Sequence, residues 1–251
     1  MKRLVRKALR KAGWELTRFR PESCQWARLK CMLSAHGVGT VLDVGANTGQ
    51  YAKNLRDAGF KGRIVSFEPT SEAHSQLCRV ARSDSMWTVA ERMAIGDWDG
   101  RTQIHVANNS VSSSLLPMLA SHRTAAPESG FVATEAVAIV RLDSIAPRFL
   151  QDDKSIFIKI DVQGFEKKVL EGAPKLLQRT VGLQIELSLT PLYDGETLFQ
   201  PMVEYLCAMD FDLWGLIPGF IDKRNGRLLQ VDGIFFQRKG EEPSLHAGFI
   251  E

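Results

Sequence analysis

The feature that most constrains the fold is an alternation of short apolar runs with amphipathic helical segments between residues 40 and 237. Each apolar run has the length of a buried strand, and helical periodicity or turn residues separate the runs. Strands that alternate with helices predict an α/β fold, with a mostly parallel sheet covered by helices on both faces. The expected strands are 40–44, 63–67, 87–93, 102–107, 136–142, 155–160, 182–187, 211–216 and 229–237.

The expected helices of this region are 50–58, 71–82, 165–177 and 198–209. The last two strands follow each other without a helix, across a Pro-Gly turn and Asn225-Gly226. This connection predicts an antiparallel hairpin at the C-terminal edge of the sheet. Residues 108–134 form a long irregular stretch that is rich in Ser and contains two prolines. A loop of that length in a compact domain is typical of a lid or a binding loop.

The first 20 residues carry the basic charge of the chain. They hold eight Lys or Arg and one acid, a net charge of +7, whereas the whole chain carries +3 and the remainder −4. Apolar residues at steps of three and four predict one amphipathic helix there: Val5, Leu9, Ala12, Leu16 and Phe19. Three roles stay open, namely peripheral membrane contact through residues 1–20, mitochondrial targeting, and a helix packed on the domain with solvated charges. The lack of serine before residue 23 disfavours targeting.

Composition and length are those of a globular protein with one large domain. We expect a helical segment at 1–37, a domain at 38–240 and a tail at 241–251. No run is long and apolar enough to span a membrane, and the N-terminus lacks a secretory signal pattern. The four cysteines lack metal-ligand spacing, which favours reduced and mostly buried thiols in a cytoplasmic protein, with membrane periphery as an open possibility. Because the basicity is confined to one end, nucleic acid is not the expected partner.

A glycine-containing turn joins the first strand of the domain to its first helix, at the edge where doubly wound sheets bind ligands. The candidate cofactor-binding residues of this turn and of the next strand end are Asp43, Gly45, Ala46, Asn47, Gly49, Glu68 and Pro69. A dinucleotide site needs the pattern Gly-x-Gly-x-x-Gly, which this turn lacks. Asp43 would repel a pyrophosphate but suits a cationic ligand, and Glu68 suits the two hydroxyls of a ribose. S-adenosylmethionine is therefore the expected cofactor, with an NAD(P)-dependent oxidoreductase as the alternative.

From residue 40 to about residue 238 the chain resembles the FkbM family of methyltransferases. The motifs that carry the resemblance follow in the family's order: 43–49, 67–69, 94–97, 112–115, 142–143, 158–166, 169–173 and 185–187. The resemblance implies a Rossmann-like class I methyltransferase fold with a seven-stranded type of sheet. It also implies O-methylation of a hydroxyl on a sugar, a glycolipid, a polyketide or a similar metabolite. Many relatives carry Glu where this chain has Gln163, which can still hydrogen-bond.

Methyl transfer to an alcohol needs a base, or a metal, to help remove the hydroxyl proton. Asp161 and Glu186 are the candidates, as base or as ligands of Mg²⁺, because carboxylates on neighbouring strands suit that ion. Lys159 is expected to orient Asp161 or the substrate, and His105 is a further candidate base. Structural roles stay open as well: Asp161 as a helix cap, and Glu186 as a buried partner of Lys159.

Two further parts of the cofactor site are expected from their positions. Ala94 and Ile95 follow the third strand, where an adenine ring would stack, and Asp161 lies beside the reacting centre of the cofactor. The serines at 112–114 are expected to form a loop over the donor or the acceptor, which would be a small molecule or a glycolipid. A non-catalytic, nucleoside-binding scaffold with the same fold is the alternative outside the enzymes.

Overall fold

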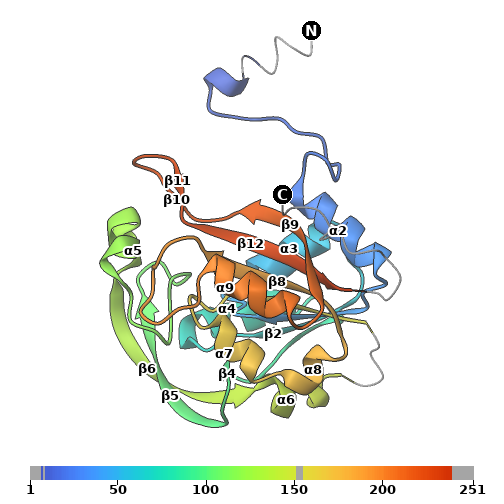
Figure 1. Cartoon of the computed structure of the whole chain (residues 1–251), viewed down its shortest axis with the longest axis vertical. Helices are drawn as coiled ribbons and strands as arrows, with labels where there is room; N and C mark the ends of the chain where they lie inside the picture. The colour runs from blue at the N-terminus through green and yellow to red at the C-terminus, as the bar shows by residue number, and fades with distance from the viewer. Residues whose placement is uncertain (1–6, 8, 151–154, 239–251) are drawn as a thin grey trace, which may run out of the picture.

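A computed structural model describes residue 7 and residues 9–150 and 155–238. A seven-stranded sheet forms its centre (Figure 1). In spatial order the strands are β3 (Trp87–Val89), β2 (Arg63–Phe67), β1 (Thr40–Val44), β7 (Ile156–Ile160), β8 (Thr180–Ser188), β12 (Gln230–Gln237) and β9 (Phe211–Pro218). The first five pair in parallel, and β12 runs antiparallel to both β8 and β9. The predicted parallel sheet with an antiparallel C-terminal edge hairpin is confirmed.

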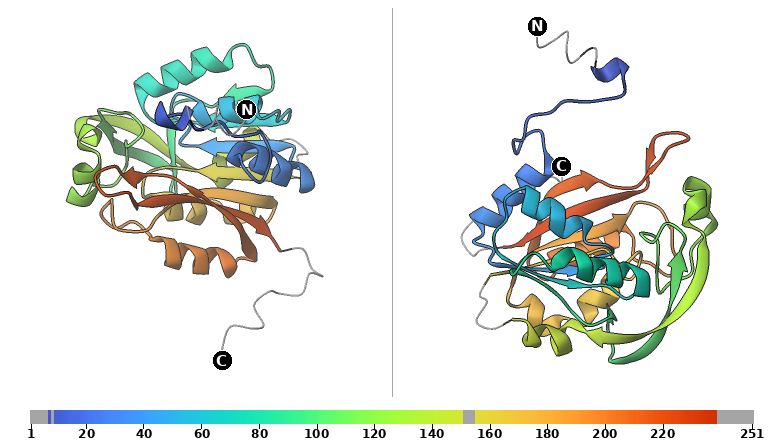
Figure 2. Two further views of the ribbon diagram at one scale, coloured as in Figure 1. Left: turned by 90° about the horizontal axis from the view of Figure 1, so that it is seen from above. Right: turned by 180° about the vertical axis from the view of Figure 1, so that it is seen from behind.

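Helices cover both faces of the sheet (Figure 2). On one face lie α2 (Gln25–Ala35), α3 (Gln50–Asp57) and α4 (Ser71–Ala81). On the other face lie α6 (Leu142–Ile145), α7 (Glu166–Glu171), α8 (Pro174–Leu177) and α9 (Phe199–Cys207). Strand β1 shows why two cores form: Val41 packs against α2 and α3, whereas Leu42 packs into the opposite cluster. Alternate side chains of a strand point to opposite faces, so a doubly covered strand is apolar throughout.

A second, three-stranded sheet lies beside the central one and corrects part of the prediction. Its strands, in spatial order, are β4 (Met93–Gly96), β6 (Phe131–Arg141) and β5 (Gly100–Ala107). The predicted strand 87–93 is wrong, because the chain leaves the central sheet after Val89 and enters the second sheet at Met93. Arg92 holds this crossing by donating to the carbonyls of Pro69 and Ala136. The strands predicted near 102–107 and 136–142 pair with each other in this sheet.

The segment predicted to be irregular, 108–134, contains short regular elements. They are α5 (Ala120–Ala125), a 3-10 helix (Pro127–Ser129) and the first residues of β6. A second 3-10 helix (Ala146–Arg148) follows α6, and a small hairpin of β10 (Ile221–Asp222) and β11 (Arg227–Leu228) connects β9 to β12. The helix predicted over 165–177 is broken into α7 and α8 at Gly172. A Cβ atom there would lie 1.9 Å from the carbonyl oxygen of Gly96, so this close approach demands glycine.

The amphipathic helix predicted through Phe19 is wrong for the residues that the structure describes. Helical residues end at Lys11, and Gly13 follows with a φ of +80°. The N–H of Trp14 bonds to the carbonyl of Leu9, and that of Gly13 to Arg10, which is a Schellman cap. Trp14 and Phe19 are 69% and 59% exposed, so they do not pack on the domain.

The other expectations for the two ends stay predictions. The predicted stripe begins at Val5, which lies outside the described residues, as do 1–6, 8 and the tail 241–251. The domain bounds 1–37 and 38–240 also stay predictions. The four cysteines are free thiols, but Cys31 is exposed and the other three are half-buried, so the expectation that they are mostly buried is wrong. Within the described ranges, no helix is long and apolar enough to cross a bilayer.

Candidate active site

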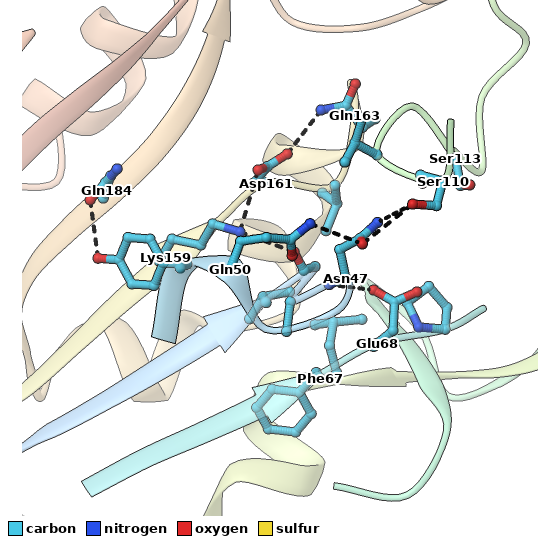
Figure 3. Close-up of a pocket in the computed structure, with 18 of the residues that line it drawn as sticks. Asn47, Gln50, Phe67, Glu68, Ser110, Ser113, Lys159, Asp161, Gln163 and Gln184 are labelled. Atoms are coloured by element: carbon cyan, nitrogen blue, oxygen red, sulfur yellow. Dashed lines mark hydrogen bonds and ion pairs between the residues drawn. The ribbon is translucent and has the colours of Figure 1, made fainter. Parts of the chain in front are cut away.

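A cavity of about 390 Å³ opens at the carboxyl ends of β1, β2 and β7 (Figure 3). Its size lies within the range of small-molecule sites. The loops that follow these strands line it, together with β4, the N-terminal ends of α2 and α3, and the serine-rich loop. Parallel strands bring their following loops to one edge of the sheet, which is where a doubly wound fold binds its ligand.

The loop after β1 approaches the loop after β7 closely. Gly45 has a φ of +76°, and a Cβ atom there would lie 1.8 Å from the carbonyl oxygen of Asp161. Glycine is therefore required at this position both by its backbone conformation and by space. Asn47 is also left-handed, with a φ of +47°, and its Oδ1 accepts the N–H of Thr48 at 2.7 Å. Gly45, Ala46 and Asn47, which are predicted to bind the cofactor, all line the cavity.

Glu68 points its carboxylate into the cavity from the end of β2 (Figure 3). Its Oε2 accepts the backbone N–H of Asn47 at 2.8 Å, and its Oε1 accepts the N–H and the hydroxyl of Thr70 at 2.9 and 2.6 Å. A carboxylate offers about four acceptor positions, so Oε2 keeps one for a ligand hydroxyl, and the hydroxyl of Thr70 can rotate away from Oε1. Burial raises the pKa of Glu68, and these hydrogen bonds oppose the rise.

One side of the cavity is apolar. Its lining residues are Phe67, Pro69, Met93, Ala94, Ile95, Ile104 and Leu115. The predicted pair Ala94 and Ile95 therefore lies where a flat ring could pack, beside the carboxylate of Glu68. The serine-rich loop reaches the same side through Ser110 and Ser113. Ser114 anchors this loop by donating to the carbonyl of Gln163 at 2.6 Å.

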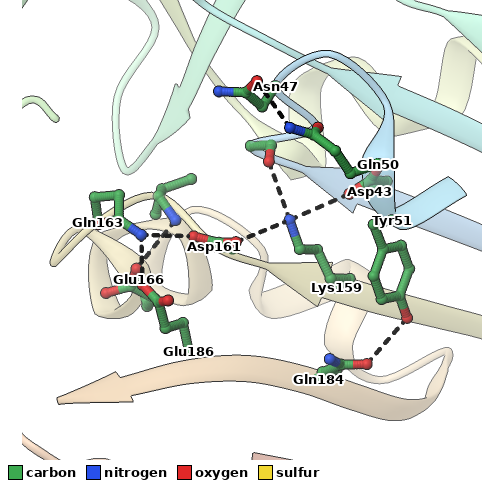
Figure 4. A network of polar contacts seen from close by, with 12 residues as sticks. Asp43, Asn47, Gln50, Tyr51, Lys159, Asp161, Gln163, Glu166, Gln184 and Glu186 are labelled. Carbon is green, nitrogen blue, oxygen red and sulfur yellow. Dashed lines mark hydrogen bonds and ion pairs between the residues drawn. The ribbon is translucent and has the colours of Figure 1, made fainter. Parts of the chain in front are cut away.

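Lys159 joins the loops after β1 and β7 (Figure 4). Its Nζ donates to the carbonyl of Gly45 at 3.0 Å and lies 3.4 Å from carboxylate oxygens of Asp43 and of Asp161. Burial lowers the pKa of Lys159, but Asp161, Asp43 and Asp232 together raise it above its usual range. The side chain is therefore a charged link and is unsuited to accept a proton.

The structure corrects the role of Asp43. Its side chain is fully buried behind the cavity, in contact with Lys159 and with the hydroxyl of Ser66, which donates to Oδ2 at 3.2 Å. The prediction of a direct contact with a cationic ligand is wrong. Burial raises the pKa of Asp43, and Lys159 opposes the rise. An acid at this position balances the buried lysine.

Gln163 separates the two acids predicted to hold a metal (Figure 4). Its Nε2 donates to Asp161 Oδ1 at 2.9 Å and to Glu186 Oε2 at 2.5 Å. An amide nitrogen thus lies between the carboxylates, where a cation would have to be, and Lys159 neutralises the other oxygen of Asp161. Among the described residues, no group of three or more His, Cys, Asp or Glu side chains could hold a metal ion. The predicted Mg²⁺ site at Asp161 and Glu186 does not fit.

Glu186 lies behind Gln163 and also accepts from Gln230 at 2.8 Å. Burial, followed by the charge of Asp161, raises its pKa well above the usual range. Its partners are two amides, in place of the ion pair with Lys159 that was considered. Asp161 in contrast lines the cavity, with its side chain a third exposed. Of the two predicted acids, only Asp161 therefore faces a ligand.

Asp161 is not the cap of the following helix. Glu166 holds this turn, because its Oε1 accepts the N–H groups of Val162 and Gly164 at 3.0 and 3.1 Å. Burial raises the pKa of Glu166 to about 8. Gln163 has a φ of +57°, and its Oε1 accepts the hydroxyl of Tyr193 at 2.7 Å. A left-handed backbone conformation that neighbouring contacts hold in place is typical of residues whose position matters for function.

Two further predicted residues lie away from the cavity. Gly49, with a φ of +88°, packs on the indole of Trp87, where a Cβ atom would lie 2.7 Å from the ring. The ring of His105 stacks on Phe131, with centroids 4.8 Å apart. Ile104 faces the cavity, so the strand alternation turns His105 to the other side of its sheet. The predictions of cofactor contact by Gly49 and of a base at His105 are wrong.

The cavity also has residues that the motifs did not reveal. They are Gln25, Trp26, Leu29, Gln50, Tyr51, Asn54, Gln184, Ile217 and Asp232. Of these residues, Asp232 is the one that the sequence could have indicated, because an acid inside a mostly apolar strand is typical of a functional position. Burial, followed by the charge of Asp161, raises the pKa of Asp232 to about 6. The other residues come from separate segments that no local pattern connects.

The sequence is similar to a family of methyltransferases and to one named methyltransferase. The sequence matches the Methyltransferase FkbM domain over residues 43–213. It is 25% identical over 177 residues to the 2-O-methyltransferase NoeI of Sinorhizobium fredii, which covers 68% of this chain and 72% of that protein.

Similar solved structures include TehB from Haemophilus influenzae, with 10% identity, a TM-score of 0.46 and 84% of this chain covered. The chain spans 62% of the length of that TehB chain. A putative S-adenosylmethionine-dependent methyltransferase from Listeria monocytogenes has 10% identity and a TM-score of 0.47, with 85% of this chain and 98% of the other covered. The family match covers more than half of the sequence, and the chain therefore belongs to the FkbM family of S-adenosylmethionine-dependent methyltransferases.

Proposed function

We propose that this protein transfers the methyl group of S-adenosylmethionine to a hydroxyl of a small-molecule acceptor, such as a sugar, a glycolipid or a polyketide. The observation that carries the proposal is the pair of pocket carboxylates. Glu68 is held at the end of β2 beside an apolar wall, and Asp161 faces the same cavity at the end of β7. The similarity to a protein named as a 2-O-methyltransferase supports oxygen as the acceptor atom.

The residues near Glu68 fit a nucleoside. The free acceptor position on Oε2 suits a ribose hydroxyl, and Ala94, Ile95 and Pro69 suit the faces of an adenine ring. Gly45 and Ala46 let the backbone approach the remainder of the donor. This donor set is neutral or acidic apart from Lys159, which favours a donor that carries positive charge.

Asp161 is the group suited to receive the hydroxyl proton. When bound, S-adenosylmethionine supplies an electrophilic methyl group on a cationic sulfur. Asp161 would take the proton that the acceptor hydroxyl gives up on methylation, because its carboxylate faces the cavity. Lys159 and Gln163 hold one carboxylate oxygen each, so they fix the orientation of Asp161.

Calorimetric titration of S-adenosylhomocysteine and of NADH into the purified protein tests the donor site. We expect micromolar binding of S-adenosylhomocysteine and none of NADH. Glu68→Gln should weaken this binding by about 1.5–3 kcal/mol, because it removes a charged hydrogen-bond acceptor. Glu204→Gln changes a surface acid that bonds to Gln200, so it serves as the matched control.

The outcomes separate the competing functions. Binding of NADH alone would favour the oxidoreductase and overturn the proposal. Unchanged affinity in Glu68→Gln would remove Glu68 from the donor site. Tight binding of S-adenosylhomocysteine without methyl transfer to any hydroxyl acceptor would favour the nucleoside-binding scaffold.

A further inference from the structure

The cavity continues beyond the donor residues, toward β8, β12 and β9. We call this part the far half and define it by its lining residues: Gln25, Trp26, Leu29, Gln50, Tyr51, Asn54, Gln184, Ile217 and Asp232. Gln184 lies on β8, the first strand past β7, whereas Asp232 and Ile217 lie on β12 and β9, farther along the sheet. Each strand adds about 4.8 Å, so the far half extends well past Asp161.

Five of the nine far-half residues lie outside the family match, which covers residues 43–213. Gln25, Trp26 and Leu29 come from α2, before this segment, and Ile217 and Asp232 come from β9 and β12, after it. The loops beside Glu68 and Gly45 lie inside the segment. The cavity thus joins a donor side that lies within the family match to a side that is built partly from its flanks.

The far half has aromatic and aliphatic side chains in its lining. Trp26 is half-buried, and its ring meets that of Tyr51 edge to face, with centroids 5.5 Å apart. Leu29 and Ile217 extend the same apolar lining. Aromatic rings offer a large rigid contact area at little cost in conformational entropy. The face of a saturated ring, which carries C–H bonds, suits such a surface.

Polar groups line the far half as well. They are mostly amides, from Gln25, Gln50, Asn54 and Gln184, with the carboxylate of Asp232. The hydroxyl of Tyr51 donates to Gln184 Oε1 at 3.1 Å. Gln184 also forms a side-chain hydrogen bond with Asp232. Amides, which donate and accept, and a carboxylate, which accepts, can bind several hydroxyl groups of one ligand.

The charges of the lining disfavour an acceptor with a negative charge. The charged lining residues are three acids, Glu68, Asp161 and Asp232, and one base, Lys159, which two carboxylates already flank. A phosphate or a carboxylate on the acceptor would meet a net negative site. A neutral ligand with many hydroxyl groups meets no such penalty.

We propose that the far half is the acceptor subsite and that it takes a neutral saturated ring with several hydroxyl groups, of the hexopyranoside kind. Trp26 packs on the face of the ring, and Asp232 and Gln184 bond its hydroxyls. This assignment rests on the proposed function, because it places the acceptor beside Asp161. It makes Trp26 and Asp232, which lie outside the family match, the residues that select the substrate.

The test is a titration of methyl glycosides into the protein saturated with S-adenosylhomocysteine. Methyl glycosides of a hexose, a 6-deoxyhexose and a pentose serve as the probes. We expect the wild-type protein to bind at least one of them, Trp26→Ala to weaken that binding at least tenfold, and Asp232→Asn to weaken it as well. Trp98→Ala is the matched control, because Trp98 is 40% exposed and contacts Phe165. Trp26→Leu, which keeps an apolar side chain at α2, should show the same loss if the aromatic face is what binds.

The affinity for S-adenosylhomocysteine, measured in the same variants, distinguishes the two proposals. It should stay within twofold of the wild type in Trp26→Ala. Normal donor binding with no glycoside bound by the wild type overturns the sugar-like acceptor and leaves the methyltransferase in place. Equal glycoside binding in Trp26→Ala and the wild type overturns the subsite. Parallel loss of donor binding in Trp26→Ala would assign the far half to the donor, and a wild type that binds no S-adenosylhomocysteine would remove the proposed function itself.

Discussion

The two halves of the cavity are built in different ways. We call the part of the cavity around Gly45, Asn47 and Glu68 the donor half, and its shape depends on the backbone. A glycine loop lies at Gly45, the N–H of Asn47 donates to Glu68, and the loops follow neighbouring parallel strands. The far half depends on side chains from α2, α3, β8, β9 and β12, most of which are distant in sequence. A backbone cradle accepts one shape of ligand, whereas the half-buried Trp26 and Asp232 can be exchanged at less cost to the core than the buried Leu29 and Ile217. The comparison suggests why one fold can keep its donor and vary its acceptor.

The same difference decides what could be predicted from the sequence. Gly45, Asn47 and Glu68 lie in short motifs at strand ends, so their positions followed from the strand pattern alone. Trp26 and Asp232 are about two hundred residues apart, and only the sheet order brings them together. Their roles required the tertiary structure.

Errors of a single residue show a second limit. His105 was predicted at the site, but its neighbour Ile104 is the residue that faces the cavity. The periodicity of a strand fixes which residues share a face, and the sequence did not show which face of β5 was inward. The prediction for Asp43 failed for a related reason. The motif located Asp43 at the site, but its side chain is buried and pairs with Lys159. The central sheet was predictable, because its buried strands carry continuous apolar runs.

Lys159 lies where the two halves meet, and its loss should have the largest effect. Its side chain is 7% exposed, and it neutralises the fully buried Asp43. Lys159→Met leaves that carboxylate without a charged partner, which typically costs about 3–5 kcal/mol of unfolding free energy. Urea unfolding near neutral pH measures this loss, and both halves of the cavity should lose their ligands.

The dependence of this loss on pH identifies its cause. Burial already raises the pKa of Asp43 above its unfolded value, and removal of Lys159 raises it further. Asp43 of the folded variant therefore holds its proton more tightly than Asp43 of the unfolded chain. The stability of the variant should rise as the pH falls through the folded pKa of Asp43 and the carboxyl becomes protonated. Asp43→Asn in the Lys159→Met background should restore part of the stability. A deficit independent of pH and unaffected by Asp43→Asn would contradict the ion-pair explanation.

Asp161 should separate chemistry from binding. Asp161→Asn keeps the size of the side chain but removes the group that accepts the proton, so turnover should fall about a hundredfold or more. Donor binding should stay close to that of the wild type, because Glu68 and the Gly45 loop are unchanged. Release of S-adenosylhomocysteine in the presence of a hydroxyl acceptor measures turnover, and calorimetry measures binding. An unchanged rate would remove Asp161 from the reaction.

Gly45→Ala should sharpen the contrast by disturbing the donor half alone. Gly195 provides the control, because its φ of +75° matches the +76° of Gly45 but a Cβ atom there meets nothing within 4 Å. Gly195→Ala therefore reports the cost of a left-handed alanine, about 1–2 kcal/mol. At Gly45 the added carbon also overlaps the carbonyl of Asp161, and overpacking of this kind adds about 1–3 kcal/mol.

The difference between the two unfolding free energies isolates the contact between the loops after β1 and β7. Gly45→Ala should also weaken the binding of S-adenosylhomocysteine at least tenfold, whereas Gly195→Ala should leave this binding unchanged. Equal losses of stability in the two variants would mean that the loops move apart at no cost. In that case the donor half would be as adjustable as the far half, and the contrast between a backbone cradle and an exchangeable side-chain surface would fail.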